Sequence, residues 1–418
     1  MSRSASVRSL ALLSLVASVA CSRAIAGDAL QSDTVEIGAT LPLSGVDAKP
    51  AAAFREGYEL AFDEANARGG LLVSGQKRKA HLRLLDDAGS TENAALLAER
   101  LIDGEGVRFM LGTYQSTLVM AQSKVAERSR VPYVNGGGAA TEIYANTHWI
   151  FGLLAPVDLL AYSMMRWVDV EQNTGKLPSP LRVAVLWEKT AHGKDFERGV
   201  VDFAGKSARR RASYEVVFDE SYALGSPDAK GVMQRLKAAN ADVFLADAHL
   251  ADFLTLEQEY LAAGLCHRVV SYGARGTEQQ AAEKFGRDKV SGILSAVWWS
   301  SEIGHELNHA FVESYSARYH TKPEWYSALA YESARALFTA IENAGSLERE
   351  KVREALASLQ MASILPGGRL SFQNGHAQYP FVVEQNQPAG GTAIVYPTEL
   401  SQAQGAVNSS CPSRLAAR

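Results

Sequence analysis

The feature that most constrains the fold is a regular alternation of short apolar runs with segments of helical period, which begins at Val35. Such runs are typical of strands in a parallel sheet, because helices must cover both faces of that sheet. The strands expected in the first part of the chain are 35–41, 81–85, 107–112, 131–134 and 149–154. The helices expected between them are 52–68, 91–104 and 117–129. The pattern predicts a doubly wound α/β lobe.

The same alternation then restarts after a helix that begins near residue 159. The strands expected in this second part are 183–187, 214–218, 243–246, 269–272 and 293–299, and the helices are 195–206, 229–240 and 251–263. Two further helices, 306–319 and 327–344, precede strands at 369–372, 379–384 and 392–396. The sequence therefore predicts two similar α/β lobes in tandem.

The late helices should return to the first lobe, because each face of its sheet needs a helical layer. We expect lobe 1 to comprise 34–154 with 298–366, and lobe 2 to comprise 155–297 with 367–397, followed by a tail at 398–418. Two lobes joined by several crossings form a hinge with a cleft between them. In open parallel sheets, ligands bind beyond the carboxyl ends of the strands, which directs attention to the loops at the cleft.

The first 26 residues have the pattern of an export signal. Arg3 and Arg8 precede an apolar stretch too short to span a bilayer, and small residues at 24–26 form a cleavage site. The pattern favours cleavage after Ala26 and a periplasmic location. The alternative is a lipid anchor at Cys21, since Ser18–Cys21 resembles a lipoprotein box without its usual leucine.

Composition excludes several classes of protein. The 42 basic residues stand against 46 acidic ones, which provides no positive field for nucleic acid. Three cysteines are too few for a disulfide-stapled miniprotein. After cleavage only Cys266 and Cys411 remain, and they form either a disulfide or two unpaired thiols, since the sequence gives no distance between them.

Two loops after strands carry groups suited to an anion. The segment 113–117 (TYQST), which includes Tyr114 and Ser116, places hydroxyls and free N–H groups at the start of a helix. The alternative for Ser116 is a simple helix cap, and the two roles can coexist. The segment 135–142 (NGGGAATE) can expose consecutive N–H groups to a carboxylate. It lacks the spacing of a phosphate or dinucleotide loop.

The chain resembles the branched-chain-amino-acid-binding family of periplasmic proteins, the type I substrate-binding proteins of ABC importers. The segments that carry the resemblance, in the family's order, are 35–45 (VEIGATLPLSG), 55–61 (REGYELA), 66–70 (NARGG), 85–88 (LDDA), 112–117, 131–133, 193–196 and 367–372. The resemblance implies two α/β lobes with three hinge crossings, which close over a small solute and present it to a membrane permease. It implies a monomer with no cofactor and no catalytic residues.

The resemblance also assigns residues of the first lobe. The carboxylate-binding serine of the family falls on Ser116, and the backbone groups of its next loop fall on Gly137 and Ala139. Because Ala139 stands where threonine is common, one side-chain donor is lost.

The second lobe departs from the family at one position. Aromatic positions of the family fall on His192, His249 and Tyr326, the last in the side-chain pocket. Where amino-acid binders place a carboxylate for the ligand's ammonium, this chain has Arg275, which would repel an ammonium and attract a second anionic group. A shift of the alignment would bring Glu278 to that place instead. Amino acids and aromatic or dicarboxylic acids therefore all remain candidate ligands.

Trp298 and Trp299 lie at an expected crossing, where one could stack on the ligand or both could pack in the hinge. The segment 305–309 (HELNH) matches the zinc-protease motif, in which two histidines bind metal and Glu306 activates water. A surface helix start and the lack of a third ligand motif speak against it. A second alternative is a ligand sensor of the same fold that serves a chemoreceptor or kinase.

Overall fold

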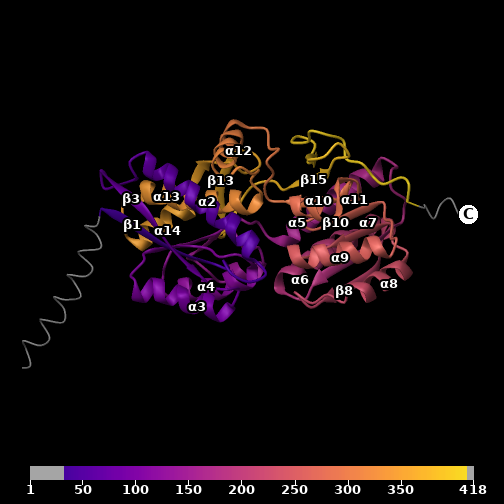
Figure 1. Cartoon of the computed structure of the whole chain (residues 1–418), viewed down its shortest axis with the longest axis horizontal. Coiled ribbons are helices and arrows are strands. Elements are labelled where there is room, and N and C mark those ends of the chain that lie inside the picture. The colour runs from indigo at the N-terminus through magenta and orange to yellow at the C-terminus, as the bar shows by residue number, and fades with distance from the viewer. Residues whose placement is uncertain (1–32, 412–418) are drawn as a thin grey trace, which may run out of the picture.

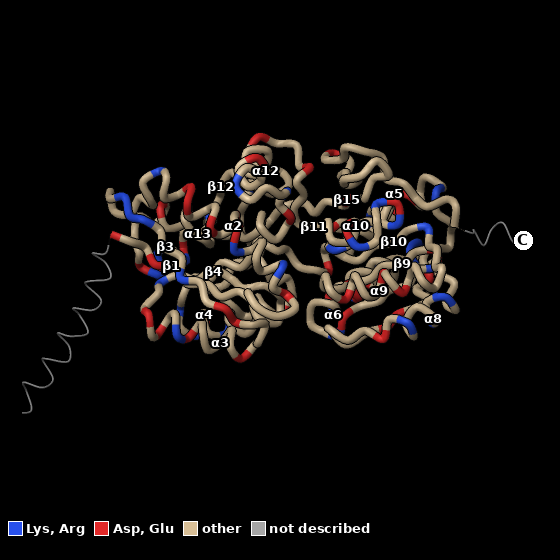
Figure 2. The backbone as a smooth tube through the Cα atoms, viewed as in Figure 1, with Lys and Arg blue, Asp and Glu red and all other residues tan. Residues whose placement is uncertain are grey.

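The computed structural model describes residues 33–411, which form two α/β lobes side by side (Figure 1). The predicted signal segment, with Cys21, lies outside the described residues, as does the end of the predicted tail. None of the helices in 33–411 combines the length and apolar character needed to cross a bilayer. Acidic and basic residues are interspersed over both lobes (Figure 2).

The first lobe is built on a sheet of nine strands. They are β1 (Thr34–Leu41), β2 (Leu71–Val73), β3 (Gln76–Asp86), β4 (Phe109–Leu111), β5 (Tyr133–Asn135), β6 (Ile150–Gly152), β12 (Gln360–Ala362), β13 (Arg369–Gln373) and β14 (His376–Ala377). Their order is β12-β13-β14-β6-β5-β4-β1-β3-β2. The central strands β1, β3, β4, β5 and β6 pair in parallel, as the buried apolar runs predict.

The second lobe is built on a sheet of seven strands. They are β7 (Leu181–Glu188), β8 (Tyr214–Tyr222), β9 (Val243–Ala246), β10 (Val269–Tyr272), β11 (Leu294–Val297), β15 (Val382–Asn386) and β16 (Thr392–Tyr396). Their order is β16-β15-β11-β10-β9-β7-β8. The strands β7 to β11 pair in parallel, whereas β15 and β16 are added antiparallel at one edge. The predicted pair of doubly wound parallel lobes is confirmed.

Helices cover both sheets. Those of the first lobe are α2 (Ala48–Ala67), α3 (Thr91–Glu99) with a π-helical turn (Arg100–Gly104), α4 (Ser116–Arg128), the 3₁₀ turn η2 (Thr141–Tyr144), α12 (Glu306–Tyr319), α13 (Trp325–Ala344) and α14 (Arg349–Ala357). Those of the second lobe are α5 (Val157–Asn173), α6 (Ala191–Gly205), α7 (Ala208–Ser213), α8 (Ala229–Ala239), α9 (Leu250–Ala262), α10 (Gln279–Phe285) and α11 (Arg287–Val290). The late helix α13 packs along α2, which confirms the expected return to the first lobe (Figure 1).

Within residues 33–411 the chain crosses between the lobes three times, after β6, after β11 and after β14. The predicted boundary at residue 367 is wrong. Strand β13 pairs with β14, and His376 of β14 pairs with Gly152 of β6, so this hairpin extends the first sheet. Only β15 and β16 join the second lobe, because the third crossing follows the hairpin instead of preceding it.

Cys266 and Cys411 form a disulfide, which confirms the first of the two alternatives. Cys266 precedes β10, so the bond ties the end of the described chain to the second lobe. Further contacts hold the same segment, since Asn408 N–H donates to the Arg268 carbonyl at 2.9 Å and Ala406 pairs with the Gln385 side chain. The C-terminal segment is therefore part of the second lobe's structure.

His267, next to the disulfide, should make the protein sensitive to acid. Burial lowers the pKa of its imidazole to about 4, well below the value of about 6.5 expected in the unfolded chain. Between these values the unfolded state binds a proton that the folded state does not, so stability falls as pH falls. Between pH 7.5 and pH 5, we expect the free energy of unfolding of the wild type to fall by about 2 kcal/mol more than that of His267→Gln.

Urea unfolding at the two pH values measures this loss of stability. His309→Gln is the matched control, because His309 is exposed. Equal pH dependence of the wild type and His267→Gln would contradict the prediction.

Candidate functional site

A small cavity lies between the lobes, at the carboxyl ends of the parallel strands. It is lined by Tyr114, Gln115, Ser116, Gly137, Ala139, Leu154, His192, His249, Arg275, Trp298 and Trp325. Eight of the nine residues proposed from the sequence are among them, and the ninth, Tyr326, contacts Tyr114 at 5.4 Å between ring centroids. The cavity volume of about 10 Å³ is that of one water at most, so a ligand can bind only when the lobes part.

The first-lobe wall is formed by the start of α4. Gln115, which precedes the helix, has φ 77° and ψ 162°, a conformation that costs a residue with a side chain roughly 1–3 kcal/mol. Its side chain fixes this conformation by donating from Nε2 to Asp47 Oδ2 at 3.0 Å. No side chain caps α4, so its first N–H groups and its positive end are directed at the cavity.

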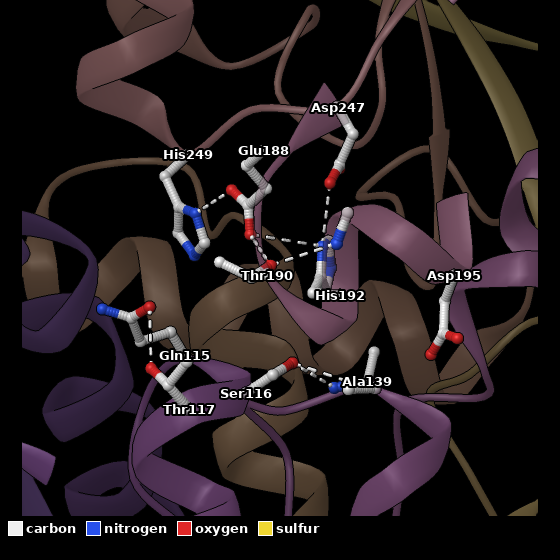
Figure 3. A network of polar contacts seen from close by, with 12 residues as sticks. Gln115, Ser116, Thr117, Ala139, Glu188, Thr190, His192, Asp195, Asp247 and His249 are labelled. Atoms are coloured by element: carbon white, nitrogen blue, oxygen red, sulfur yellow. Dashed lines mark hydrogen bonds and ion pairs between the residues drawn. The ribbon is translucent and has the colours of Figure 1, made fainter. Parts of the chain in front are cut away.

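Ser116 connects this helix to the glycine-rich loop. Its Oγ accepts hydrogen bonds from the N–H groups of Ala139 at 3.0 Å and Ala140 at 3.2 Å (Figure 3). Since Oγ acts as acceptor in both, its own hydroxyl proton is left to donate into the cavity. Ser116 is thus both a structural link between two loops and a candidate ligand donor.

The sequence predicts that the glycine-rich loop exposes its N–H groups to a ligand, but two of these groups are bonded within the protein. The Gly137 N–H donates to Asn135 Oδ1 at 2.8 Å, and the Ala139 N–H is taken by Ser116. These groups therefore organise the loop instead of facing a ligand as free donors. A glycine is needed at 137 because this loop passes close to the backbone of Thr113. A Cβ atom on residue 137 would lie 2.1 Å from the Thr113 carbonyl oxygen.

The second-lobe wall carries two imidazole–carboxylate pairs. His249 Nδ1 lies 2.5 Å from Glu188 Oε2, and His192 Nδ1 lies 2.9 Å from Asp247 Oδ2 (Figure 3). Both carboxylates are almost completely buried, and Glu188 also accepts a hydrogen bond from Thr190. His192 lies in the first turn of α6, which follows β7, and His249 lies in the loop after β9.

The charges of these pairs depend on each other. Burial opposes protonation of His192, but the neighbouring Asp247 outweighs it and raises the pKa of the imidazole. Burial likewise disfavours the charged form of Glu188, but His249 and His192 lower the pKa of its carboxyl. Ligand atoms of Glu188, His192 and Asp247 lie within 4.8 Å of one another, so this donor set could also hold a metal ion.

Replacing Asp247 by asparagine should lower the pKa of His192, because the largest effect that raises it is then removed. An NMR titration of the imidazole, assigned with His192→Gln, measures this change. Asp219→Asn is the control, since that exposed carboxylate accepts from Trp187 on the same lobe. An unchanged His192 titration in Asp247→Asn would contradict this account of the pair.

Arg275 enters the cavity from the loop after β10 and is 5% exposed. Its guanidinium lies 4.8 Å from the Trp325 ring centroid and 5.3 Å from that of Tyr326. Nη2 donates to the Tyr114 hydroxyl at 3.0 Å, which joins the two lobes. Nε and Nη1 have no hydrogen-bond partner among the described residues.

Glu278, the alternative to Arg275 in the sequence, does not line this cavity. It accepts from the Tyr326 hydroxyl at 2.7 Å and lies 3.5 Å from Arg275 Nη1. Burial raises the pKa of its carboxyl to about 8, although Arg275 opposes the shift. Glu278 faces a separate hollow of about 590 Å³ near the hinge, which it shares with Glu324 and Glu384.

The two tryptophans of the second crossing have different surroundings. Trp298 lines the cavity and donates from Nε1 to the Ala155 carbonyl at 2.9 Å, in the first crossing. Trp299 does not line it, and its Nε1 donates to Asn308 Oδ1 at 2.7 Å. Trp299 therefore packs in the hinge, whereas Trp298 joins two crossings beside the cavity.

Comparison with known proteins agrees with this geometry. A family model described as "Periplasmic binding protein" matches residues 34–391. The chain belongs to the periplasmic binding protein family. The Leu/Ile/Val-binding protein homolog 8 of Brucella abortus is 26% identical over 335 residues, 78% of this chain and 81% of that protein. The resemblance found in the sequence is thus confirmed.

Two solved structures have the same fold. The leucine binding protein LivK of Thermotoga maritima has a TM-score of 0.74 at 21% identity, covering 86% of this chain and 97% of its own. A solute binding protein of an ABC transporter from R. palustris, in complex with benzoate, has a TM-score of 0.74 at 20% identity, covering 89% and 99%. These neighbours are solute-binding proteins, and this periplasmic binding protein is not an enzyme.

The His-Glu-x-x-His segment has a structural role in this periplasmic binding protein. His305 is the N-cap of α12, where its Nδ1 accepts from the Asn308 N–H at 3.3 Å. Its Nε2 lies 3.1 Å from the Leu365 carbonyl oxygen, and His309 is exposed. The two imidazoles therefore do not form the metal pair that the motif describes.

Sequence reasoning missed three lining residues of the periplasmic binding protein and both buried carboxylates. Gln115 lies inside the segment 113–117, Leu154 ends the predicted strand 149–154, and Trp325 begins α13, far along the chain. Glu188 ends β7 directly after an apolar run, and a buried acid at such a place is a signal for a partner such as His249. Asp247 follows β9 in the same way.

Proposed function

We propose that this periplasmic binding protein is exported, captures a small carboxylate-bearing ligand between its lobes, and delivers it as a monomer to the permease of an ABC importer. The observation that carries the proposal is the facing of two anion-attracting walls across one cavity. The first holds the uncapped start of α4 with the Ser116 hydroxyl, and the second holds the buried guanidinium of Arg275. An α-helix N-terminus and an arginine both favour a carboxylate.

The names and ligands of similar proteins support a ligand that carries a carboxylate. The Brucella relative is named for leucine, isoleucine and valine, and the R. palustris neighbour holds benzoate. All of these ligands carry one carboxylate. Closure would be driven by contacts that form only when both walls touch the ligand, since a ligand shifts the equilibrium by its differential affinity for the closed state.

A thermal-shift screen of carboxylic acids, followed by isothermal titration, tests this proposal on the chain starting at Gly27. We expect one class of acids to raise Tm and to bind in a 1:1 ratio. Amines and neutral amides of matched size are the controls. If no carboxylic acid binds, the proposal fails. If acids bind but deletion of the gene leaves their uptake unchanged, the role is that of a sensor instead of a transporter.

Cell fractionation tests export. When the full-length chain is expressed, we expect the protein in the periplasmic extract, with Gly27 as its first residue. Retention in the membrane fraction that Cys21→Ser abolishes would identify a lipid anchor instead.

A further inference from the structure

The carboxylates of the second-lobe wall are already engaged by imidazole side chains of the protein. Glu188 and Asp247 each bind one imidazole, at 2.5 Å and 2.9 Å. Glu278, the remaining acid near Arg275, lies outside the cavity lining and is hydrogen-bonded to Tyr326. No described residue lining the cavity therefore offers an unpaired carboxylate to the ammonium of an α-amino acid.

The same pairing directs the free side of each imidazole to the cavity. Because Nδ1 of both His192 and His249 is engaged by a carboxylate, Nε2 is the nitrogen that remains for a ligand. Figure 3 shows the second ring nitrogen of His249 on the side facing Gln115 and Ser116.

Arg275 adds unpartnered donors to this wall. It is 5% exposed, yet Nε and Nη1 have no hydrogen-bond partner among the described residues. Leaving buried charged donors unsatisfied is costly, so the geometry calls for an acceptor between the lobes. Glu278 neutralises Arg275 only in part, since burial raises the pKa of that carboxyl to about 8 and keeps it largely protonated at neutral pH.

Both walls therefore present positive charge, and apolar surface lies between them. The rings of Tyr114, Trp298 and Trp325 and the side chain of Leu154 line the same cavity. From this arrangement we infer that the natural ligand is a dicarboxylic acid with an apolar or aromatic spacer, whose first carboxylate binds Ser116 and whose second binds Arg275 with His192 and His249. The inference rests on the proposed function and narrows its ligand class.

Matched pairs of acids test the inference by isothermal titration at pH 7. Terephthalate differs from benzoate by one carboxylate, and adipate differs from hexanoate in the same way. Leucine differs from 4-methylpentanoate only by its ammonium. We expect at least one diacid to bind at least 30-fold more tightly than its monoacid, and 4-methylpentanoate to bind at least tenfold more tightly than leucine.

Variants of Arg275 locate the second carboxylate. Arg275→Ala should weaken the preferred diacid at least 30-fold and its matched monoacid by a factor at least tenfold smaller, while Arg275→Lys should restore part of the diacid affinity. Arg210→Ala is the control, because that guanidinium also lies over an aromatic ring, 3.8 Å from the Phe203 centroid and outside the cavity lining. Circular dichroism and Tm confirm that each variant is folded.

The outcomes separate the two proposals. Tight leucine binding, or diacids that bind no more tightly than monoacids, would overturn the dicarboxylate inference and leave carboxylate capture intact. Equal diacid affinity in Arg275→Ala and the wild type would likewise overturn it. Failure of every acid to bind would overturn the proposed function itself.

Discussion

Replacing Cys266 and Cys411 together by serine should lower the free energy of unfolding by about 4 kcal/mol, the largest stability effect expected in this protein. The bond joins residues separated by 145 positions, so breaking it returns a long loop to the unfolded ensemble and raises its conformational entropy. The native C-terminal segment keeps its bonds to Gln385 and Arg268, so the variant should still fold.

Guanidinium unfolding with and without reductant measures the effect. Reductant should destabilise the wild type and leave the double serine variant unchanged, which makes the variant its own control. Single substitutions are unsuitable, because each leaves a free thiol. A loss below about 1 kcal/mol would show that the bond adds little beyond the other contacts of the C-terminal segment.

The local elements of the fold were the most predictable part. The strands at 243–246, 269–272 and 392–396 and the helix at 306–319 have their predicted bounds. Each strand is a short apolar run, and the helix is bracketed by His305 as N-cap and His320 in the left-handed conformation as C-cap. Such boundaries are set by neighbours in the chain, which a sequence displays directly.

The placement of the late hairpin β13–β14 was less predictable, because it depends on residues that are distant in the chain. The choice of sheet for β13 and β14 depends on pairing with β6, more than 200 residues earlier in the chain. Helix α14 was not anticipated, although it is nine residues long. Long-range pairing leaves no local pattern, so the order of elements was clear while the position of the third crossing was not.

The candidate site was likewise predictable only in its local features. Loops after parallel strands could be selected in advance, because the carboxyl ends of strands meet at one edge of a sheet. The partners of the selected residues could not, since Glu188 and Asp247 lie 61 and 55 positions from the histidines they bind. These partners change the chemistry of the wall, because they consume the carboxylates that would otherwise suit an ammonium group.

Ser116→Ala should weaken binding of the preferred acid by at least about 100-fold, or roughly 3 kcal/mol. Two losses combine in this variant. The ligand loses the hydroxyl donor at the start of α4, and the buried N–H groups of Ala139 and Ala140 lose their acceptor. The second loss also loosens the contact between α4 and the glycine-rich loop, which form the first-lobe wall.

Isothermal titration with terephthalate, or with the acid that binds most tightly in the screen, measures this effect. Ser123→Ala is a matched control on the same helix, since Ser123 is also buried but its Oγ donates to the Met120 carbonyl at 3.0 Å, away from the cavity lining. We expect that control to bind within threefold of the wild type. Wild-type affinity in Ser116→Ala would place the ligand's first carboxylate elsewhere, and the positive end of α4 would then no longer explain why an acid is selected.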